Sequence, residues 1–353
     1  MSVKLPVECR ELLEVQRGMI SRKQAIGCGL TGATVDRLAR TGRWLVVQRG
    51  VYSVAGTAAG YAARSADRSA DLSASLSADL SREAMLWAAT LRVGPGAALS
   101  HQTAAELNGL YDEPSSLVHV SVPEPRHIAP PRGIVLHRSS HIAEATQPNL
   151  LPPRTRIEHT TLDLAHQAYT FDRAFHIACA ACQRRLTTAA RLRQAMAARA
   201  KMRWRADLAV ALGEIAAGVH SLLEYRYVRR VEQPHGLPTA LRQARVVVGG
   251  RTRYIDDLYA GYGVCVELDG RQAHPDDRRW LDVRRDNSVA AEGLVTLRYG
   301  WAEVTEWPCA TAAEVGRALM ARRWPGPLRP CGPDCTALRA GSGSRQSTTF
   351  VAP

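Results

Sequence analysis

Apolar positions in residues 1–56 recur first with helical and then with strand spacing. The pattern predicts helices over residues 5–17, Arg22–Ile26 and Gly32–Arg40 and strands over Trp44–Gln48 and Val51–Val54. Ser21 and Thr31 stand directly before the second and third helix, where hydroxyl side chains cap the first turn. Three helices followed by a hairpin are the parts of a winged helix-turn-helix domain, which we expect over residues 1–56.

Residues 57–82 contain few large apolar side chains. Alanine, serine and aspartate form a near-repeat there, which predicts a low-complexity linker. Residues 83–204 follow as a middle α/β module without a set of residues that predicts catalysis. Helical segments are expected over Arg82–Leu91, Ser100–Leu107 and the alanine-rich Thr160–Ala198, and strands over Val118–Val122 and Gly133–Arg138.

The pattern changes again over residues 205–325. A helix is expected over Ala206–Val231, then strands over Ala244–Val248, Thr252–Leu258 and Val264–Leu268, a helix over Asp276–Glu292 and a strand over Leu294–Tyr299. This α-β-β-β-α-β order predicts a separate α/β domain. Residues 326–353 are rich in glycine, proline and serine, which predicts a disordered tail. The expected fold class is therefore α+β multidomain.

Charge narrows the class of partner. The 353 residues include 46 Lys and Arg against 33 Asp and Glu, a net charge of +13. A surplus of this size favours a polyanion such as double-stranded DNA. Lysine occurs only at Lys4, Lys23 and Lys201, so arginine supplies almost all of the positive charge. A GC-rich genome would explain that ratio but not the surplus over acids.

Hydropathy and cysteine content bear on location and scaffold. No apolar run reaches the ~20 residues of a membrane span, and the charged N-terminus lacks the apolar centre of a secretory signal. Eight cysteines are too few for a disulfide scaffold in a chain of 353 residues, so we expect a cytoplasmic protein with no membrane partner. Cys179 with Cys182, and Cys331 with Cys335, lack a second ligand pair at zinc spacing, which favours core packing and incidental tail thiols.

Three motifs in the first domain carry a family resemblance. They are GMISRKQA at residues 18–25, Leu30 with Thr31, and GRWLVVQRGVY at residues 42–52. With them, roughly residues 8–56 resemble the winged-helix domain of AbiEi-type antitoxins, which regulate their own operons in abortive-infection systems. The resemblance implies double-stranded DNA and a cognate toxin as partners.

A recognition helix enters the major groove with its N-terminus first, so the third helix would present its first turn to the bases. The expected DNA contacts are Arg22, Lys23, Thr31, Thr34, Arg37, Arg43 and Arg49. Arg43 and Arg49 belong to the hairpin and would reach the backbone or the minor groove. The alternative is a winged helix that contacts protein, with these arginines only solvating its surface. The excess of basic over acidic residues here favours DNA.

A second set of motifs lies in the C-terminal domain. They are SLLEYRY at residues 221–227, YIDDLY at 254–259 and VELDG at 266–270, followed by His274. With them, roughly residues 218–308 resemble the PD-(D/E)XK nuclease fold of very-short-patch-repair endonucleases. The catalytic residues that this resemblance implies are Glu224, Asp256, Glu267, Asp269 and His274, with Mg²⁺ as the cofactor.

Strand geometry agrees with a metal site. Asp256 and Glu267 would lie on adjacent strands joined by a short turn, and Glu267 and Asp269 would share one face of one strand. Because Mg²⁺ prefers hard oxygen ligands, Asp256 and Glu267 are the expected metal ligands. Two alternatives stay open: Glu224 follows Ser221 by three residues, as in a helix cap, and aspartate is common near turns such as the one after Asp256.

The lysine that PD-(D/E)XK enzymes usually carry two residues after the second acid is missing. Asp269 occupies this position, and no lysine follows Lys201. Arginine cannot replace it as a base, because arginine stays protonated in proteins. His274 is then the candidate acid or base, since histidine titrates near neutral pH. The alternative is a surface histidine in a loop before Pro275.

Two interpretations of function remain open. The first is a DNA-binding protein with a Mg²⁺-dependent endonuclease domain in phage defence. The second is a transcriptional regulator or antitoxin of a type IV toxin–antitoxin system whose nuclease fold is catalytically silent. Convergence of Glu224, Asp256, Glu267 and Asp269, with His274 in reach, favours the first; scattered carboxylates favour the second.

Overall fold

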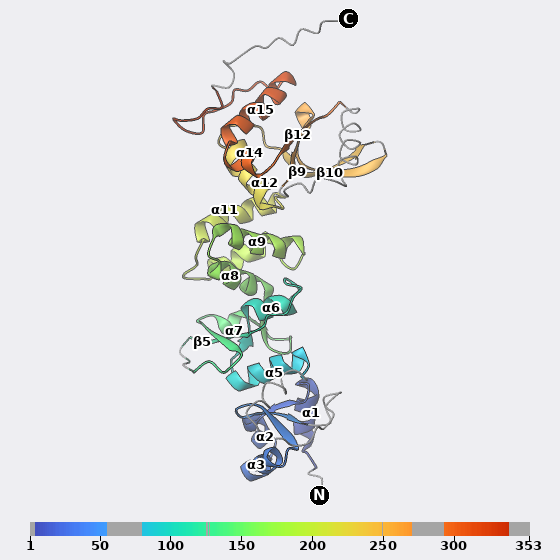
Figure 1. The fold of residues 1–353 in the computed structure, drawn as a ribbon, viewed down its shortest axis with the longest axis vertical. Coiled ribbons are helices and arrows are strands. Elements are labelled where there is room, and N and C mark those ends of the chain that lie inside the picture. Colours follow the sequence, from blue (N-terminus) through green and yellow to red (C-terminus); the bar gives the residue numbers. More distant parts are fainter. Residues whose placement is uncertain are drawn as a thin grey trace, which may run out of the picture. The chain divides into compact units, whose positions relative to one another are not determined.

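The computed structural model of the protein describes residues 4–54, 80–124, 126, 128–248, 250–269 and 293–338. These residues form helices and several sheets, so the mixed α+β class expected from the sequence is confirmed (Figure 1). The chain divides into two compact units. The first contains the chain up to Ala168 with Arg184–Thr187 and Gln194–Arg203, and the second contains Tyr169–Gln183, Thr188–Arg193 and the chain from Trp204 onward.

The N-terminal module of the first unit consists of three helices and a small sheet. Its elements are α1 (Val7–Val15), β1 (Met19–Ser21), α2 (Arg22–Gly27), α3 (Gly32–Arg40), β2 (Trp44–Gln48) and β3 (Val51–Val54). The strands are antiparallel in the order β1-β3-β2. Ser21 and Gln24 form a reciprocal capping box on α2, and the Thr31 hydroxyl caps α3. The expected helices and hairpin are confirmed, whereas β1 has only 3 residues and leaves no clear apolar pattern.

One core lies between these helices and the sheet. Its buried side chains include Leu13, Ile20, Val35, Leu38 and Trp44. Met19 and Val51 instead pack against Trp87 of α5 (Arg82–Val93). The N-terminal module and α5 are therefore parts of one packed unit. Residues 55–79, most of the expected linker, lie outside the described residues.

A five-stranded sheet follows α5 in the order β6-β5-β4-β8-β7. Its strands are β4 (Ala98–Leu99), β5 (Val118–Pro123), β6 (Ile134–Ser139), β7 (Thr146–Gln147) and β8 (Arg154–Thr155). The two longest strands, β5 and β6, are parallel. Two short helices, α6 (His101–Leu107) and α7 (Ile142–Ala145), complete this part of the chain.

The alanine-rich stretch expected as one helical run over Thr160–Ala198 is divided. It forms α8 (Ile157–Gln167), α9 (Phe171–Gln183) and α10 (Ala189–Ala197). Thr170 and Thr188 stand before α9 and α10, and their hydroxyls accept the N–H groups of Arg173 and Arg191. Local start signals therefore override the uniform helix propensity of alanine. The module boundary expected at residue 204 also differs, because α9 belongs to the second unit.

The second unit contains a four-stranded sheet in the order β12-β11-β10-β9. The strands are β9 (Leu241–Val248), β10 (Arg251–Tyr259), β11 (Val264–Leu268) and β12 (Val295–Tyr299), and α14 (Trp301–Thr305) and α15 (Pro308–Ala321) follow them. β9, β10 and β11 are antiparallel neighbours, while β12 runs parallel to β11. The helix expected over Asp276–Glu292 lies outside the described residues.

The single helix expected over Ala206–Val231 is interrupted. The structure has α11 (Arg205–Ala216), α12 (Leu222–Tyr227) and a π-helical turn over Val228–Glu232. Gly218 follows α11 with a φ of +102°, a left-handed conformation that glycine adopts without strain. The Ser221 hydroxyl then caps the start of α12. This new start places Glu224 in the first turn of a helix.

Residues 326–338, expected as the start of a disordered tail, fold onto the second unit. Leu328 is buried in the same core cluster as Tyr227. A Cβ at Gly316 would lie 2.8 Å from Leu328, so this glycine leaves the space that the leucine fills. The domain therefore continues past the expected boundary at residue 325, and residues 339–353 lie outside the described residues.

Candidate functional site

The exposed face of α3 is the first candidate surface. Val35 and Leu38 are buried, and Ala33, Arg37 and Arg40, at helical spacings of about one turn, share the opposite side. Arg37 and Arg40 are exposed. The helix thus turns two guanidinium groups away from the core, as a helix that binds a polyanion requires.

Thr31 and Thr34 lie at the N-terminus of α3. Their hydroxyl oxygens are 2.9 Å apart, and the Thr31 hydroxyl also accepts the Thr34 N–H (3.2 Å). A hydroxyl has one donor and two acceptor sites, so these cap contacts leave hydrogen-bonding capacity for a ligand. Arg43 is exposed directly before β2.

Arg22 is engaged within the protein. Its guanidinium makes a bidentate ion pair with the Asp36 carboxylate on α3, and one of the two N–O distances is 3.0 Å. The hydrogen bonds from Arg22 lower the pKa of Asp36, and those to Asp36 raise the pKa of Arg22. Arg22 therefore joins the start of α2 to α3 and positions the helix on which Arg37 lies.

Lys23 and Arg49 lie at a different place from the exposed face of α3. With Arg92 and Arg126 they line a cavity of about 940 Å³ beside the β2–β3 turn and α5. The Arg22 N–H donates to the carbonyl of Gly50 in that turn (2.8 Å). Of the residues expected to contact DNA, Arg22, Lys23 and Arg49 line this cavity, whereas Thr31, Thr34 and Arg37 belong to α3 and its N-cap.

The second candidate surface is a carboxylate site in the second unit. Glu224 on α12 is only 5% exposed. Its Oε2 accepts the N–H of His220 (2.9 Å), and its own N–H donates to Ser221 Oγ (3.1 Å). Burial raises the pKa of the Glu224 carboxyl, and the negative charge of Asp256 raises it further. The sequence left open whether Glu224 belongs to a helix cap or to a group of carboxylates. In the structure Glu224 takes part in both.

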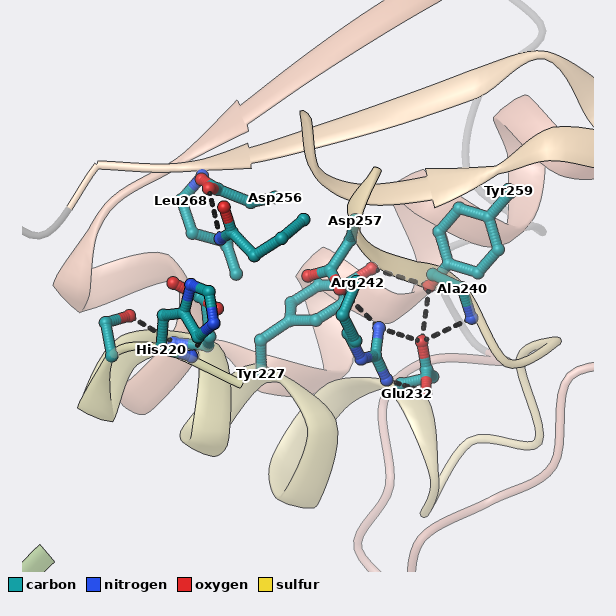
Figure 2. Close-up of polar contacts among 12 residues, drawn as sticks. His220, Tyr227, Glu232, Ala240, Arg242, Asp256, Asp257, Tyr259 and Leu268 are labelled. Atoms are coloured by element: carbon teal, nitrogen blue, oxygen red, sulfur yellow. Dashed lines mark hydrogen bonds and ion pairs between the residues drawn. The ribbon is translucent and has the colours of Figure 1, made fainter. Parts of the chain in front are cut away.

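Asp256 lies within β10 and not in the turn that follows it. Its Oδ2 accepts the N–H of Leu268 at the end of β11 (2.8 Å; Figure 2). Its Oδ1 accepts Nε2–H of Gln243 on β9 (3.0 Å). The Gln243 side chain also acts as a hydrogen-bond partner of Glu224, which lowers the pKa of that carboxyl against the effect of burial. One neutral amide thus serves both acids.

The strand pair is irregular at this point. Gln243 has a φ of +46°, in the left-handed region. Strict alternation would place Ile255 and Leu258 on opposite faces of β10, yet both are buried in one cluster with Cys265. The alternation therefore breaks at Asp256, opposite Gln243. Sequence reasoning missed Gln243, because a lone glutamine in a strand belongs to no motif.

Glu267 lies on the strand beside Asp256. β10 and β11 are adjacent antiparallel strands, and Asp256 and Glu267 directly adjoin the last pair of their register, Asp257 opposite Val266. Glu267 shares a face of β11 with Cys265, two residues earlier, whereas Val266 and Leu268 on the other face belong to the core cluster that contains Tyr227 of α12. The adjacent-strand arrangement expected for these two acids is therefore present.

Asp269 and His274 complete the expected set. The Asp269 side chain is 72% exposed and lies 3.5 Å from Arg298 of β12. It is thus a more exposed acid than Glu224, at the end of the same strand as Glu267. His274, the expected acid or base, lies outside the described residues.

A buried ion network adjoins this site. Arg242 on β9 pairs with Glu232 of the π-helical turn and with Asp257 of β10 (Figure 2). These three side chains are 5%, 3% and 0% exposed, respectively, and the Tyr259 hydroxyl donates to Glu232 (3.2 Å). Burial raises the pKa of Asp257, although Arg242 lowers it. Of the two neighbouring aspartates, Asp257 therefore fixes the strand and Asp256 faces the carboxylate site.

Residues 9–55 match the family model described as transcriptional regulator, AbiEi antitoxin. This match covers the N-terminal module, and it confirms the N-terminal part of the resemblance derived from the sequence motifs. The N-terminal module is thus similar to a transcriptional regulator. No curated protein matches the chain. Across the described ranges, no helix combines the length and apolar character that a membrane span needs.

The carboxylate site has donor chemistry that suits a divalent cation. Each carboxylate oxygen has two lone pairs, so the bonds from Leu268 and Gln243 leave Asp256 with acceptor capacity. Glu224 is buried beside another acid, and the amide of Gln243 adds no positive charge between them. A bound cation would relieve the repulsion between the Glu224 and Asp256 carboxylates. The site residues fit Mg²⁺, which takes oxygen ligands and keeps several waters.

Proposed function

We propose that this chain is a DNA-binding transcriptional regulator whose N-terminal module works as a winged helix-turn-helix. α3 is the recognition helix and enters the major groove of double-stranded DNA. Arg37 reaches bases or phosphates, and Arg43 and Arg49 of the hairpin follow the backbone. The DNA partner is the operator of the chain's own operon, and the protein partner is a cognate toxin.

The observation that carries this proposal is the coincidence of the family match with the basic face of α3. Residues 9–55 are similar to a transcriptional regulator, and within them Arg37 and Arg40 lie exposed one turn apart. The net charge of +13 supports a polyanionic partner. Arg22 and Asp36 hold α3 against α2, so the recognition surface is preorganised.

Binding to a duplex that carries the DNA upstream of the chain's own gene tests this proposal. In an electrophoretic mobility-shift assay, the double substitution Arg37→Ala and Arg43→Ala should abolish binding to this duplex, since each base contact contributes about 1–3 kcal/mol. Arg10→Ala is the matched control, because Arg10 is an exposed arginine of the same module on α1. Unchanged binding by the double variant would refute the assignment.

A second function is favoured by one specific observation, the pairing of buried Glu224 with Asp256 at the carboxylate site. We propose that Glu224, Asp256 and Glu267 hold Mg²⁺ for hydrolysis of DNA phosphodiesters. When bound, the ion would stabilise negative charge on the attacking and leaving oxygens. Gln243 and the Leu268 N–H orient Asp256, and His274 is the proposed acid or base.

Plasmid cleavage with Mg²⁺ or Mn²⁺ tests the second function. Wild-type protein should nick or linearise the plasmid, and Glu267→Gln should lose the activity. Glu306→Gln is the control, because Glu306 is an exposed acid at the end of α14. If wild type and Glu267→Gln are equally inert with both metals, the nuclease proposal is wrong and the regulator proposal stands alone.

A further inference from the structure

Three cysteines and one histidine of the second unit meet at one point. His235 follows the π-helical turn, Cys309 lies in the first turn of α15, and Cys331 and Cys335 lie in the segment after α15. The ligand atoms of all four residues lie within 4.8 Å of one another. None of these residues belongs to the carboxylate site or to the N-terminal module.

The distances between the sulfur atoms fit ligands of one metal ion. Cys309 Sγ lies 3.6 Å from Cys331 Sγ and 3.8 Å from Cys335 Sγ. A tetrahedral zinc site with Zn–S bonds of about 2.3 Å places its sulfur atoms about 3.8 Å apart. A disulfide bond would bring two sulfurs to about 2.05 Å, and three thiols cannot all pair with each other.

His235 is oriented as a metal ligand. Its Nδ1 donates to the Val231 carbonyl (2.8 Å), which leaves a lone pair on Nε2. The side chain is 0% exposed, and Nε2 is buried without a hydrogen-bond partner. An unpartnered buried nitrogen is unfavourable in a folded protein. A backbone bond on one ring nitrogen with the other aimed at a metal is the usual arrangement of zinc-binding histidines.

The backbone brings the four residues together by specific contacts. The Arg329 N–H donates to the carbonyl of His235 (2.8 Å). Gly236 permits this approach, because a Cβ there would lie 2.9 Å from the Arg329 side chain. A turn with a Cys335 N–H to Gly332 carbonyl bond (3.2 Å) then folds Cys335 back beside Cys331.

We propose that His235, Cys309, Cys331 and Cys335 bind one Zn²⁺ ion in a tetrahedral structural site. Four protein ligands close the coordination sphere, so the ion has no open position for catalysis. Its role is to fasten the segment after α15 to the helical part of the unit, beside the turn that carries Glu232. The sequence did not predict this site. Cys331 and Cys335 form one close pair, but His235 and Cys309 lie far from that pair along the chain.

Metal analysis of the full chain, purified under reducing conditions, tests the proposal. We expect about one zinc per chain, and we expect Co²⁺ added to the chelator-stripped protein to give thiolate-to-cobalt charge-transfer bands. The double substitution Cys331→Ser and Cys335→Ser should remove both signals. Cys182→Ser is the control, because Cys182 is a half-buried thiol on α9 of the same unit and should leave them unchanged.

The wild-type measurements keep the test independent of whether the double variant folds. Wild-type protein without bound zinc and without cobalt–thiolate bands would overturn the proposal. A Cys309–Cys331 disulfide in the reduced preparation would also overturn it. Retention of zinc by the double variant would show that the ion binds elsewhere and would contradict the ligand assignment.

Discussion

Gln243 donates a hydrogen bond from Nε2 to Oδ1 of Asp256, 3.0 Å away, across the β9–β10 pair. The same side chain is a hydrogen-bond partner of Glu224, so the amide serves two acids of the carboxylate site. An amide has two N–H donors and no charge. It therefore holds both carboxylates in place while the negative charge stays available to a cation.

Gln243→Ala should destabilise the second unit at alkaline pH. A hydrogen bond to a charged group contributes about 1.5–3 kcal/mol, and we expect about 1.5 kcal/mol because Asp256 is half-buried. The fold raises the pKa of Glu224. The Glu224 and Asp256 carboxylates repel each other above that pKa, and the repulsion disappears when Glu224 takes up a proton. Urea unfolding should therefore show a larger loss at pH 8 than at pH 4.

The matched control for this prediction is Gln233→Ala. Gln233 is exposed and donates to Glu214 (2.9 Å), so the same substitution should change stability by less than about 0.5 kcal/mol. Alanine and glutamine have the same left-handed strain at position 243, so Gln243→Ala removes the side-chain hydrogen bonds without changing the backbone strain. A loss at position 243 that does not vary with pH would contradict the bridging role.

Arg242→Leu should destabilise the protein strongly. The substitution leaves Glu232 and Asp257 buried without their positive partner, and breaking such a pair costs about 3–5 kcal/mol. Arg245→Leu, at an exposed position of the same strand, should change stability by no more than about 0.5 kcal/mol. Equal losses in the two variants, measured by chemical unfolding, would show that the network contributes no special stability.

Much of the local structure could be predicted from apolar spacing and caps. Ser21 and Thr31 stand where the structure has helix starts, and the bounds of α3, β2 and β3 agree with the predicted ones. The errors occur where composition misleads. Alanine content hid the helix starts at Thr170 and Thr188, and glycine and proline content suggested disorder for a segment whose Leu328 is buried in the core.

For the candidate site, the sequence predicts which strands carry two of the acids. Asp256 and Glu267 lie on adjacent strands because a short turn joins β10 to β11, which sequence spacing shows. Gln243 and Arg242 were not predictable, because their partners lie on other elements and their residue types are common on strand surfaces. His235 and Cys309 escaped for the same reason: their convergence depends on tertiary packing of segments distant in sequence.

Stability of the first unit should fall as the pH drops from neutral. Burial, together with the charges of His119, Arg199 and His166, lowers the pKa of His101 to about 3. The unfolded chain takes up this proton near pH 6.5, so the contribution is fully present above that pH and is lost progressively towards pH 3. At pH 5 the loss from His101 alone is about 2 kcal/mol.

His101→Gln should flatten this pH dependence between pH 7 and pH 5, as measured by urea unfolding at each pH. His176→Gln, at an exposed histidine of α9, should leave the dependence as it is in wild type. His101 stacks on His137 with ring centroids 3.6 Å apart, so a protonated imidazole there would meet a second buried ring. If the free energy of unfolding of His101→Gln varies with pH as it does in wild type, other groups cause the acid sensitivity.

Arg37 and Arg22 should affect DNA binding in different ways. Each phosphate contact contributes about −0.9 to the slope of log Kobs against log salt concentration, so Arg37→Gln should make the slope less negative by about that amount if it binds phosphate. Arg22 is paired with Asp36, so Arg22→Gln should weaken binding by loosening α3 while changing the slope much less. Arg10→Gln should change neither quantity. A slope change for Arg22→Gln equal to that of Arg37→Gln would mean that Arg22 leaves Asp36 and contacts phosphate directly, as the sequence alone suggested.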